Sequence, residues 1–209
     1  LAILIGWLSG QAQVNAPTVH CISVDEVTGD VTLTWTPPAD PNGQFFAYLL
    51  QVSNNQTGPF TDITVPTIGT TSYTHTVNAN LGMWFYRVRT IYVNAGVQDT
   101  SAAQQGTLRT MLPQFVNTTD STARVGWNAT VTGGLPGDAT DYDVYRRMGA
   151  GNPWQLIGTR PLANRLFLDS FKVCSEDIAF KVEIANAQGN CVSSSAVIEQ
   201  LFEDNTAPD

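Results

Sequence analysis

The sequence predicts an all-β chain that folds as two β-sandwiches in tandem. Residues 84–90 and 178–184 both alternate a large apolar residue with a charged or small one, which is the period of a strand with one buried face. The first half holds seven short runs of this kind in about 95 residues, which is typical of a sandwich. The second half repeats the first at a nearly constant offset, as expected for two copies of one unit.

Size and charge narrow the classes of function. The chain has 209 residues, enough for two small domains that each bury a core. Its 10 Lys and Arg against 18 Asp and Glu give a net charge of −8. This charge argues against nucleic-acid binding and against an anionic membrane surface. The only adjacent basic pair, Arg146-Arg147, is interpreted as a solvated strand face.

The first residues resemble the end of a secretory signal peptide. Residues 1–8 are mainly apolar, and the small residues Gly10 and Ala12 would precede a cut that leaves Gln13 first. The alternative is a buried first strand. No run reaches the roughly 20 apolar residues of a membrane span. The expected division is a signal-peptide remnant (1–12), two sandwiches (13–111 and 113–203) and a linker (204–209).

Turn-forming residues separate the expected strands of the first sandwich. Breaks rich in Gly, Pro, Asn and Asp occur at 28–30, 37–43, 54–59, 78–82 and 94–96. The runs between them predict strands at 19–24, 31–35, 45–52, 60–65, 72–77, 84–93 and 100–111.

The repeat aligns aromatic and apolar positions of the two halves. Most matched pairs lie 94 residues apart: Tyr48 with Tyr142, Phe60 with Trp154, Ile63 with Ile157, Tyr73 with Phe167, Tyr86 with Phe180, and Val88 with Val182. Trp35 and Trp127 lie 92 apart, so the second copy gains two residues, which we place in the Gly/Pro loop 132–140. The join at 108–113 is short, and we expect the domains to sit end to end with limited swing.

These residues resemble tandem fibronectin type III domains over about residues 17–203. The family usually has a Tyr at the start of its sixth strand, where this chain has Trp84 and Ile178. The phrases at 21–38, 72–76, 108–110 and 189–193 resemble repeats that precede the gliding motility-associated C-terminal domain in surface proteins of Bacteroidetes. In that family the terminal domain directs export by the type IX secretion system.

Three cysteines leave two pairings open in a secretory context. Cys174–Cys191 lies within the second domain, but a straight sixth strand would separate these residues by more than roughly 20 Å, beyond disulfide reach. The alternative is Cys21–Cys191 across the domains, with Cys174 left for a partner further along the chain.

No residue is predicted to be catalytic, cofactor-binding or metal-binding. His20 and His75 are the only imidazoles, and neither lies in a catalytic motif. The pair Asp141 and Asp143 and the pair Glu176 and Asp177 are interpreted as exposed carboxylates. With Asp138, the first pair lacks the ligand spacing of an EF-hand.

The function expected from these features is non-catalytic. A secreted or cell-surface module would act as a spacer or an adhesive region, with a protein or a surface glycan as partner. Loops 37–43, 94–99 and 132–140 are the candidate contact surfaces. The alternative is an accessory module of a secreted hydrolase whose catalytic domain lies beyond residue 209. Nucleic acid, cofactors and membrane insertion after signal removal are not expected.

Overall fold

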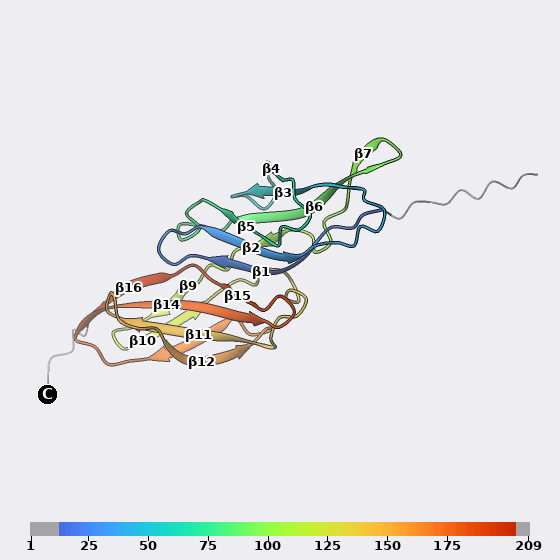
Figure 1. The fold of residues 1–209 in the computed structure, drawn as a ribbon. Coiled ribbons are helices and arrows are strands. Elements are labelled where there is room, and N and C mark those ends of the chain that lie inside the picture. The colour runs from blue at the N-terminus through green and yellow to red at the C-terminus, as the bar shows by residue number, and fades with distance from the viewer. Residues whose placement is uncertain (1–12, 204–209) are drawn as a thin grey trace, which may run out of the picture.

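The computed structural model describes residues 13–203 as two β-sandwiches built from strands, turns and loops. In Figure 1 the first sandwich, coloured blue to green, lies above the second, coloured yellow to red. The predicted fold class, all-β with two tandem sandwiches, is confirmed. The expected signal-peptide remnant and C-terminal linker lie outside the described residues.

In the first sandwich, the three-stranded sheet β1-β2-β5 packs against a second sheet with the order β4-β3-β6-β7. The short strand β8 also pairs with β6, and every pairing is antiparallel. The strands are β1 (Thr18–Val24), β2 (Val31–Thr36), β3 (Phe45–Ser53), β4 (Thr61–Val65), β5 (Ser72–His75), β6 (Phe85–Asn94), β7 (Val97–Thr100) and β8 (Leu108–Arg109).

The second sandwich repeats this plan with sheets β13-β10-β9 and β12-β11-β14-β15. Strand β16 pairs with β14 as β8 pairs with β6. The strands are β9 (Gln114–Thr118), β10 (Thr122–Gly126), β11 (Asp141–Met148), β12 (Gln155–Pro161), β13 (Leu166–Ser170), β14 (Ser175–Asn186), β15 (Cys191–Ser194) and β16 (Ile198–Glu203).

Matched aromatic pairs fill the two cores. Trp35 and Tyr48 meet edge to face with ring centroids 5.3 Å apart, and Trp127 and Tyr142 do the same at 5.5 Å. All four rings are buried, and such pairs add about 0.5–1.5 kcal/mol to the area they bury. The repeat read from the sequence is therefore a repeat of packing.

The expected last strand of the first sandwich, at 100–111, is not continuous: β7 ends at Thr100, and further along only Leu108 and Arg109 form a strand, β8. The segment between them leaves β6 and crosses to the other sheet, where the Gln105 amide donates to the Val19 carbonyl and accepts from the Val19 N–H. A side chain thus supplies the hydrogen bonds that a neighbouring strand would give to β1.

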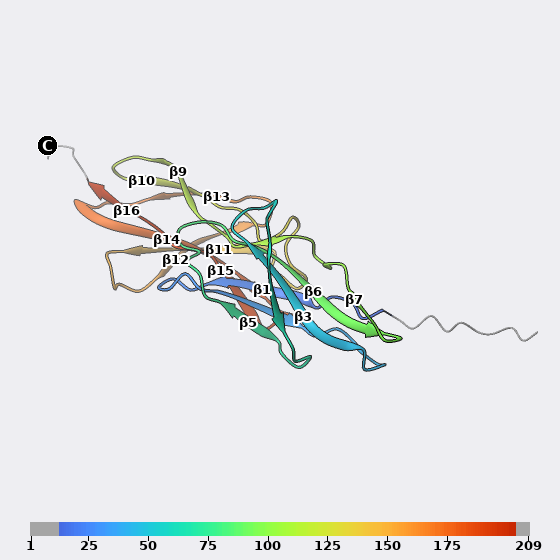
Figure 2. The same cartoon turned by 90° about the horizontal axis from the view of Figure 1, so that it is seen from above.

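The two sandwiches lie side by side, so the end-to-end arrangement expected from the short join is wrong. Figures 1 and 2 both show β1 of the first sandwich next to β15 of the second. The join itself is held: the Thr110 N–H donates to the Trp84 carbonyl, and the Leu112 N–H donates to the side chain of Asn128. Thr110 and Met111 are fully buried, so the join is packed against the domains; the limited swing stays a prediction.

Candidate functional site

The most elaborate group of contacts lies where the two sandwiches meet. Strand β1 is an edge of the sheet β1-β2-β5, and β15 is an edge of the sheet β12-β11-β14-β15. A disulfide joins Cys21 of β1 to Cys191 of β15, with their Cα atoms 6.3 Å apart. The bond spans 170 residues of sequence, so it fastens the first strand of one domain to a late strand of the other.

The structure forms the pairing across the domains and does not form Cys174–Cys191. Cys174 is exposed and carries no disulfide. It immediately precedes β14, whereas Cys191 pairs with Asn186 at the far end of that strand. Twelve residues of strand at about 3.3 Å each keep the two sulfur atoms far beyond bonding distance.

Serine side chains bridge the two edge strands next to the disulfide. The Ser23 hydroxyl donates to the Val192 carbonyl at 2.6 Å and accepts from the Ser194 N–H at 3.0 Å. In the reverse direction, the Ile22 N–H donates to the Ser193 hydroxyl at 3.0 Å. Open strand edges invite unwanted pairing, and here each edge covers the other.

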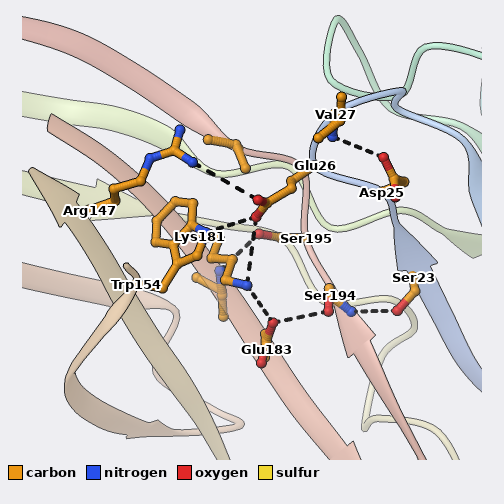
Figure 3. Close-up of polar contacts among 12 residues, drawn as sticks. Ser23, Asp25, Glu26, Val27, Arg147, Trp154, Lys181, Glu183, Ser194 and Ser195 are labelled. Atoms are coloured by element: carbon orange, nitrogen blue, oxygen red, sulfur yellow. Dashed lines mark hydrogen bonds and ion pairs between the residues drawn. The ribbon is translucent and has the colours of Figure 1, made fainter. Parts of the chain in front are cut away.

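Beyond the end of β1, a turn carries Glu26 onto the second sandwich. The Asp25 carboxylate accepts from the N–H groups of Val27 and Thr28, at 2.9 and 2.7 Å, and these bonds lower the pKa of Asp25. With the turn fixed in this way, Glu26 accepts a hydrogen bond from the Trp154 indole at 2.8 Å (Figure 3).

Two cations surround the Trp154 ring. The Arg147 guanidinium lies 4.7 Å from the ring centroid, and the Lys181 ammonium lies 5.0 Å from it. Both cations also approach Glu26, at 4.0 and 3.9 Å. Glu183 forms an ion pair with Lys181, with 2.9 Å between the carboxylate oxygen and the ammonium nitrogen. Figure 3 shows Arg147, Lys181 and Trp154 converging on Glu26, which comes from the other domain.

The expectation that Arg146-Arg147 forms a solvated face is wrong for both residues. Successive strand residues point to opposite faces. Arg147 therefore reaches the contact between the two sandwiches around Cys21–Cys191 and Glu26, which we call the joint, while Arg146 points into the second sandwich. Arg146 pairs there with Asp169 at 2.8 Å, with both side chains at most 15% exposed. Burial raises the pKa of Asp169 despite the attraction of Arg146.

Sequence reasoning missed Glu26, Lys181 and the role of Trp154. A signal for the last two is present in the repeat. Arg87 stacks on Phe60 at 4.1 Å in the first sandwich, and 94 residues later Lys181 lies over Trp154. A basic residue and an aromatic residue recurring together at this offset indicate a cation–π pair in each copy.

Loop 132–140 contributes to the joint instead of standing free at a pole. Leu135 is 4% exposed and packs with the core of the first sandwich. The Pro136 carbonyl accepts from the Asn186 amide and contacts His20 Nδ1 at 3.1 Å. Because a carbonyl oxygen can only accept, His20 Nδ1 is the donor in this contact. On the other side of the ring, His20 Nε2 lies 2.8 Å from the Thr36 hydroxyl.

The two remaining candidate loops are in the first sandwich. Within loop 37–43, Asp40 accepts from the N–H groups of Gln44 and Phe45 and shapes the turn into β3. Most of the expected loop 94–99 belongs to strands: only residues 95 and 96 separate β6 from β7, and Asn94 pairs with Val97 across this tight hairpin. Val97 is 67% exposed.

The other titratable candidates serve local structure. His75 Nδ1 lies 3.1 Å from the Tyr86 hydroxyl, and burial lowers the pKa of His75. Asp138 accepts from the Asn186 amide and the Leu135 N–H, and burial raises its pKa. Burial, Glu183 and Asp141 raise the pKa of Asp143.

The carboxylates Glu176 and Asp177 lie near the start of β14, where they pair with Phe202 and Leu201 of β16. Within residues 13–203, no three His, Cys, Asp or Glu side chains gather as a metal site would require. The same residues include no helix that is long and apolar enough to cross a membrane.

Comparison with solved structures places tandem fibronectin type III segments beside this chain. A two-domain segment of chicken tenascin is 14% identical over 91% of this chain and all of its own length, with a TM-score of 0.34. The FN1–FN3 domains of chicken CNTN1 are 15% identical over 92% of this chain and 69% of theirs, with a TM-score of 0.36. The central fibronectin-III array of RIM-binding protein is 15% identical over 94% of this chain and 71% of its own length, with a TM-score of 0.35. No protein-family model and no curated protein sequence matches the chain.

Proposed function

We propose that this chain is a non-catalytic, exported module that holds two sandwiches in one fixed relation and acts as a spacer or adhesive region of a larger surface protein. The observation that carries the proposal is the Cys21–Cys191 bond between the domains. Disulfides persist in oxidising compartments such as the extracellular space and are rare in the cytosol. A covalent joint between the domains suits a part whose purpose is to keep its shape.

The titratable groups considered as catalytic candidates support this proposal because they already have structural partners. Asp169 is paired with Arg146, Asp138 fixes the loop 132–140, and His75 bonds to Tyr86. A general base needs a nucleophile or an orienting partner within hydrogen-bond reach. The contacts of these groups are instead those of a packed sandwich.

The resemblance of the local phrases to repeats of gliding motility-associated proteins extends the proposal. Such proteins are displayed on the cell surface after type IX secretion, and a stiff pair of sandwiches would separate an exposed binding region from the cell. The joint of β1 and β15 would keep that separation constant.

Labelling of intact cells tests the proposal. Antibodies raised against this chain are applied to unpermeabilised cells of the source organism, and the thiols are trapped with iodoacetamide before lysis. The proposal expects surface labelling and one blocked thiol, that of Cys174, in each unreduced chain. A cytosolic protein with three alkylated cysteines would overturn it, and turnover of a hydrolase substrate by this chain would replace it with an enzymatic function.

A further inference from the structure

The outer face of the sheet β13-β10-β9 differs in chemistry from the same face of the first sandwich. The strand register places Leu168 beside Arg124 and Leu166 beside Gly126. The matching positions of the first sandwich are Thr74 beside Thr32 and Ser72 beside Thr34. The offsets between the copies are 94 residues for the β5–β13 pair of strands and 92 for the β2–β10 pair.

The first sandwich thus shows what the fold itself requires at these positions. Its face is covered by hydroxyl side chains, and Thr32 and Thr74 bond to each other at 2.9 Å. The second sandwich instead exposes aliphatic side chains: Leu168 is 61% exposed, and Val116 of β9 is 58% exposed. Exposed apolar area that the fold does not require is typical of a contact surface.

Three arginines frame this apolar area. Arg124 stands within it, and Arg160 and Arg165 come from β12 and from the turn before β13. No carboxylate lines either of the two hollows on this face, which have volumes of about 530 and 600 Å³ and share Leu166. Among residues 13–203, none of the three arginines forms an ion pair. A chain with a net charge of −8 thus carries a cationic face.

The joint between the domains completes one of the hollows. Met83, from the first sandwich, lines the same hollow as Val116 and Leu166 of the second. The floor is low because residue 126 is a glycine: a Cβ there would lie 3.0 Å from the Val116 side chain. The shape of the face therefore depends on both domains.

We propose that this face, defined by Arg124, Leu166, Leu168, Val116, Arg160 and Arg165, binds an acidic polypeptide segment that carries aliphatic side chains. The guanidinium groups attract and orient its carboxylates, and the exposed leucines and valine pack against its apolar residues. A polysaccharide fits less well, because burying its hydroxyl groups against aliphatic side chains without hydrogen bonds is unfavourable. The inference rests on the proposed interaction role and names the class of partner.

The test measures binding of a fluorescein-labelled decapeptide that alternates Glu and Leu to the full 209-residue chain by fluorescence anisotropy. The key variant, R124T/L166S/L168T, gives the second sandwich the residues that the first sandwich already has at these positions. A matched control, T32A/T74A, alters the corresponding face of the first sandwich. Oligogalacturonate serves as the anionic glycan probe.

We expect saturable binding of the decapeptide that weakens at least about tenfold in R124T/L166S/L168T, as for the loss of one important interface residue. Binding should also weaken in about 0.5 M salt and stay unchanged in T32A/T74A. Because R124T alone removes only an exposed side chain, it keeps the test valid if the triple variant does not fold.

Three results would overturn the inference: no saturable binding of the decapeptide, equal binding by wild type and R124T, or binding of oligogalacturonate in place of the decapeptide. Failure of the inference is distinguishable from failure of the proposed function. A surface-displayed chain that ignores the decapeptide refutes only the partner, whereas a cytosolic chain that binds it refutes only the location.

Discussion

Cys191 occupies in the second sandwich the strand position that Val97 occupies in the first, 94 residues earlier. Val97 is 67% exposed at an open edge, whereas Cys191 is bonded to Cys21 of the neighbouring domain. The same strand of the repeat is thus an open edge in the first sandwich and a covered edge in the second, and the cysteine is in the covered copy.

Replacing both bonded cysteines by serine, C21S/C191S, should lower the free energy of unfolding by about 2–5 kcal/mol, because the bond restrains a long stretch of the unfolded chain. Urea titration followed by tryptophan fluorescence measures the change. C174S is the matched control and should leave the midpoint unchanged. Equal stabilities of C21S/C191S and wild type would show that the bond does not form.

Ser23→Ala removes two hydrogen bonds between the edge strands, to the Val192 carbonyl and from the Ser194 N–H. We expect a loss of about 1–2 kcal/mol, near the usual value for two such bonds. Amide hydrogen exchange should show the Ser194 N–H opening faster. Unchanged exchange at Ser194 would mean that the serine bridge is not formed in solution.

Glu26 and Trp154 should be energetically coupled by less than about 1 kcal/mol, because the Glu26 side chain is 38% exposed and its pairs are screened by water. A double-mutant cycle of E26Q and W154F, measured by urea unfolding at low and high salt, gives the coupling. Zero coupling at low salt would contradict the contact in Figure 3.

The half-buried His75 predicts a loss of stability on acidification. Burial lowers the pKa of His75 from its usual value of about 6.5, so between that value and the lower folded-state pKa the unfolded chain binds a proton that the folded chain does not. The free energy of unfolding contributed by this group therefore falls as the pH drops from 7.5 to 5. The free energy of unfolding of H75Q should fall less steeply over the same pH range. An equal slope for H75Q and wild type would refute the lowered pKa of His75.

The repeat also provides a matched pair of tyrosines. The Tyr48 hydroxyl donates to the Ile68 carbonyl at 2.6 Å, while among the described residues the Tyr142 hydroxyl has no hydrogen-bond partner. Y48F should therefore cost about 1 kcal/mol more than Y142F. Thermal unfolding of the two variants provides the comparison, and equal costs would contradict the bond to Ile68.

The strands of the sandwiches were predictable from sequence because each has one buried face. Tyr86 and Val88 alternate with arginines, and the alternation alone indicates the strand and its inner side. The interruption of the expected last strand between β7 and β8 was not predictable in this way. It depends on Gln105 bonding to Val19, a contact between residues far apart in the chain.

The joint was predictable only in part. The length of β14 limits which cysteines can form a disulfide, and this length can be predicted from the sequence. The side-by-side placement of the domains is not, because it depends on shape complementarity among Leu135, His20 and the buried join. Arg147 illustrates the limit: its alternation predicts an outward direction, but the neighbouring domain is what covers it.

The bond between residues 21 and 191 also determines how the chain would respond to mechanical tension. A pull applied near residues 13 and 203 passes through the disulfide and bypasses the chain between the cysteines, which are separated by 170 positions in the sequence. At about 3.3 Å per residue, roughly 560 Å of chain then stays shielded from the load. Under oxidising conditions the pair of sandwiches would act as a strut of nearly fixed length, and reduction would convert it into an extensible tether.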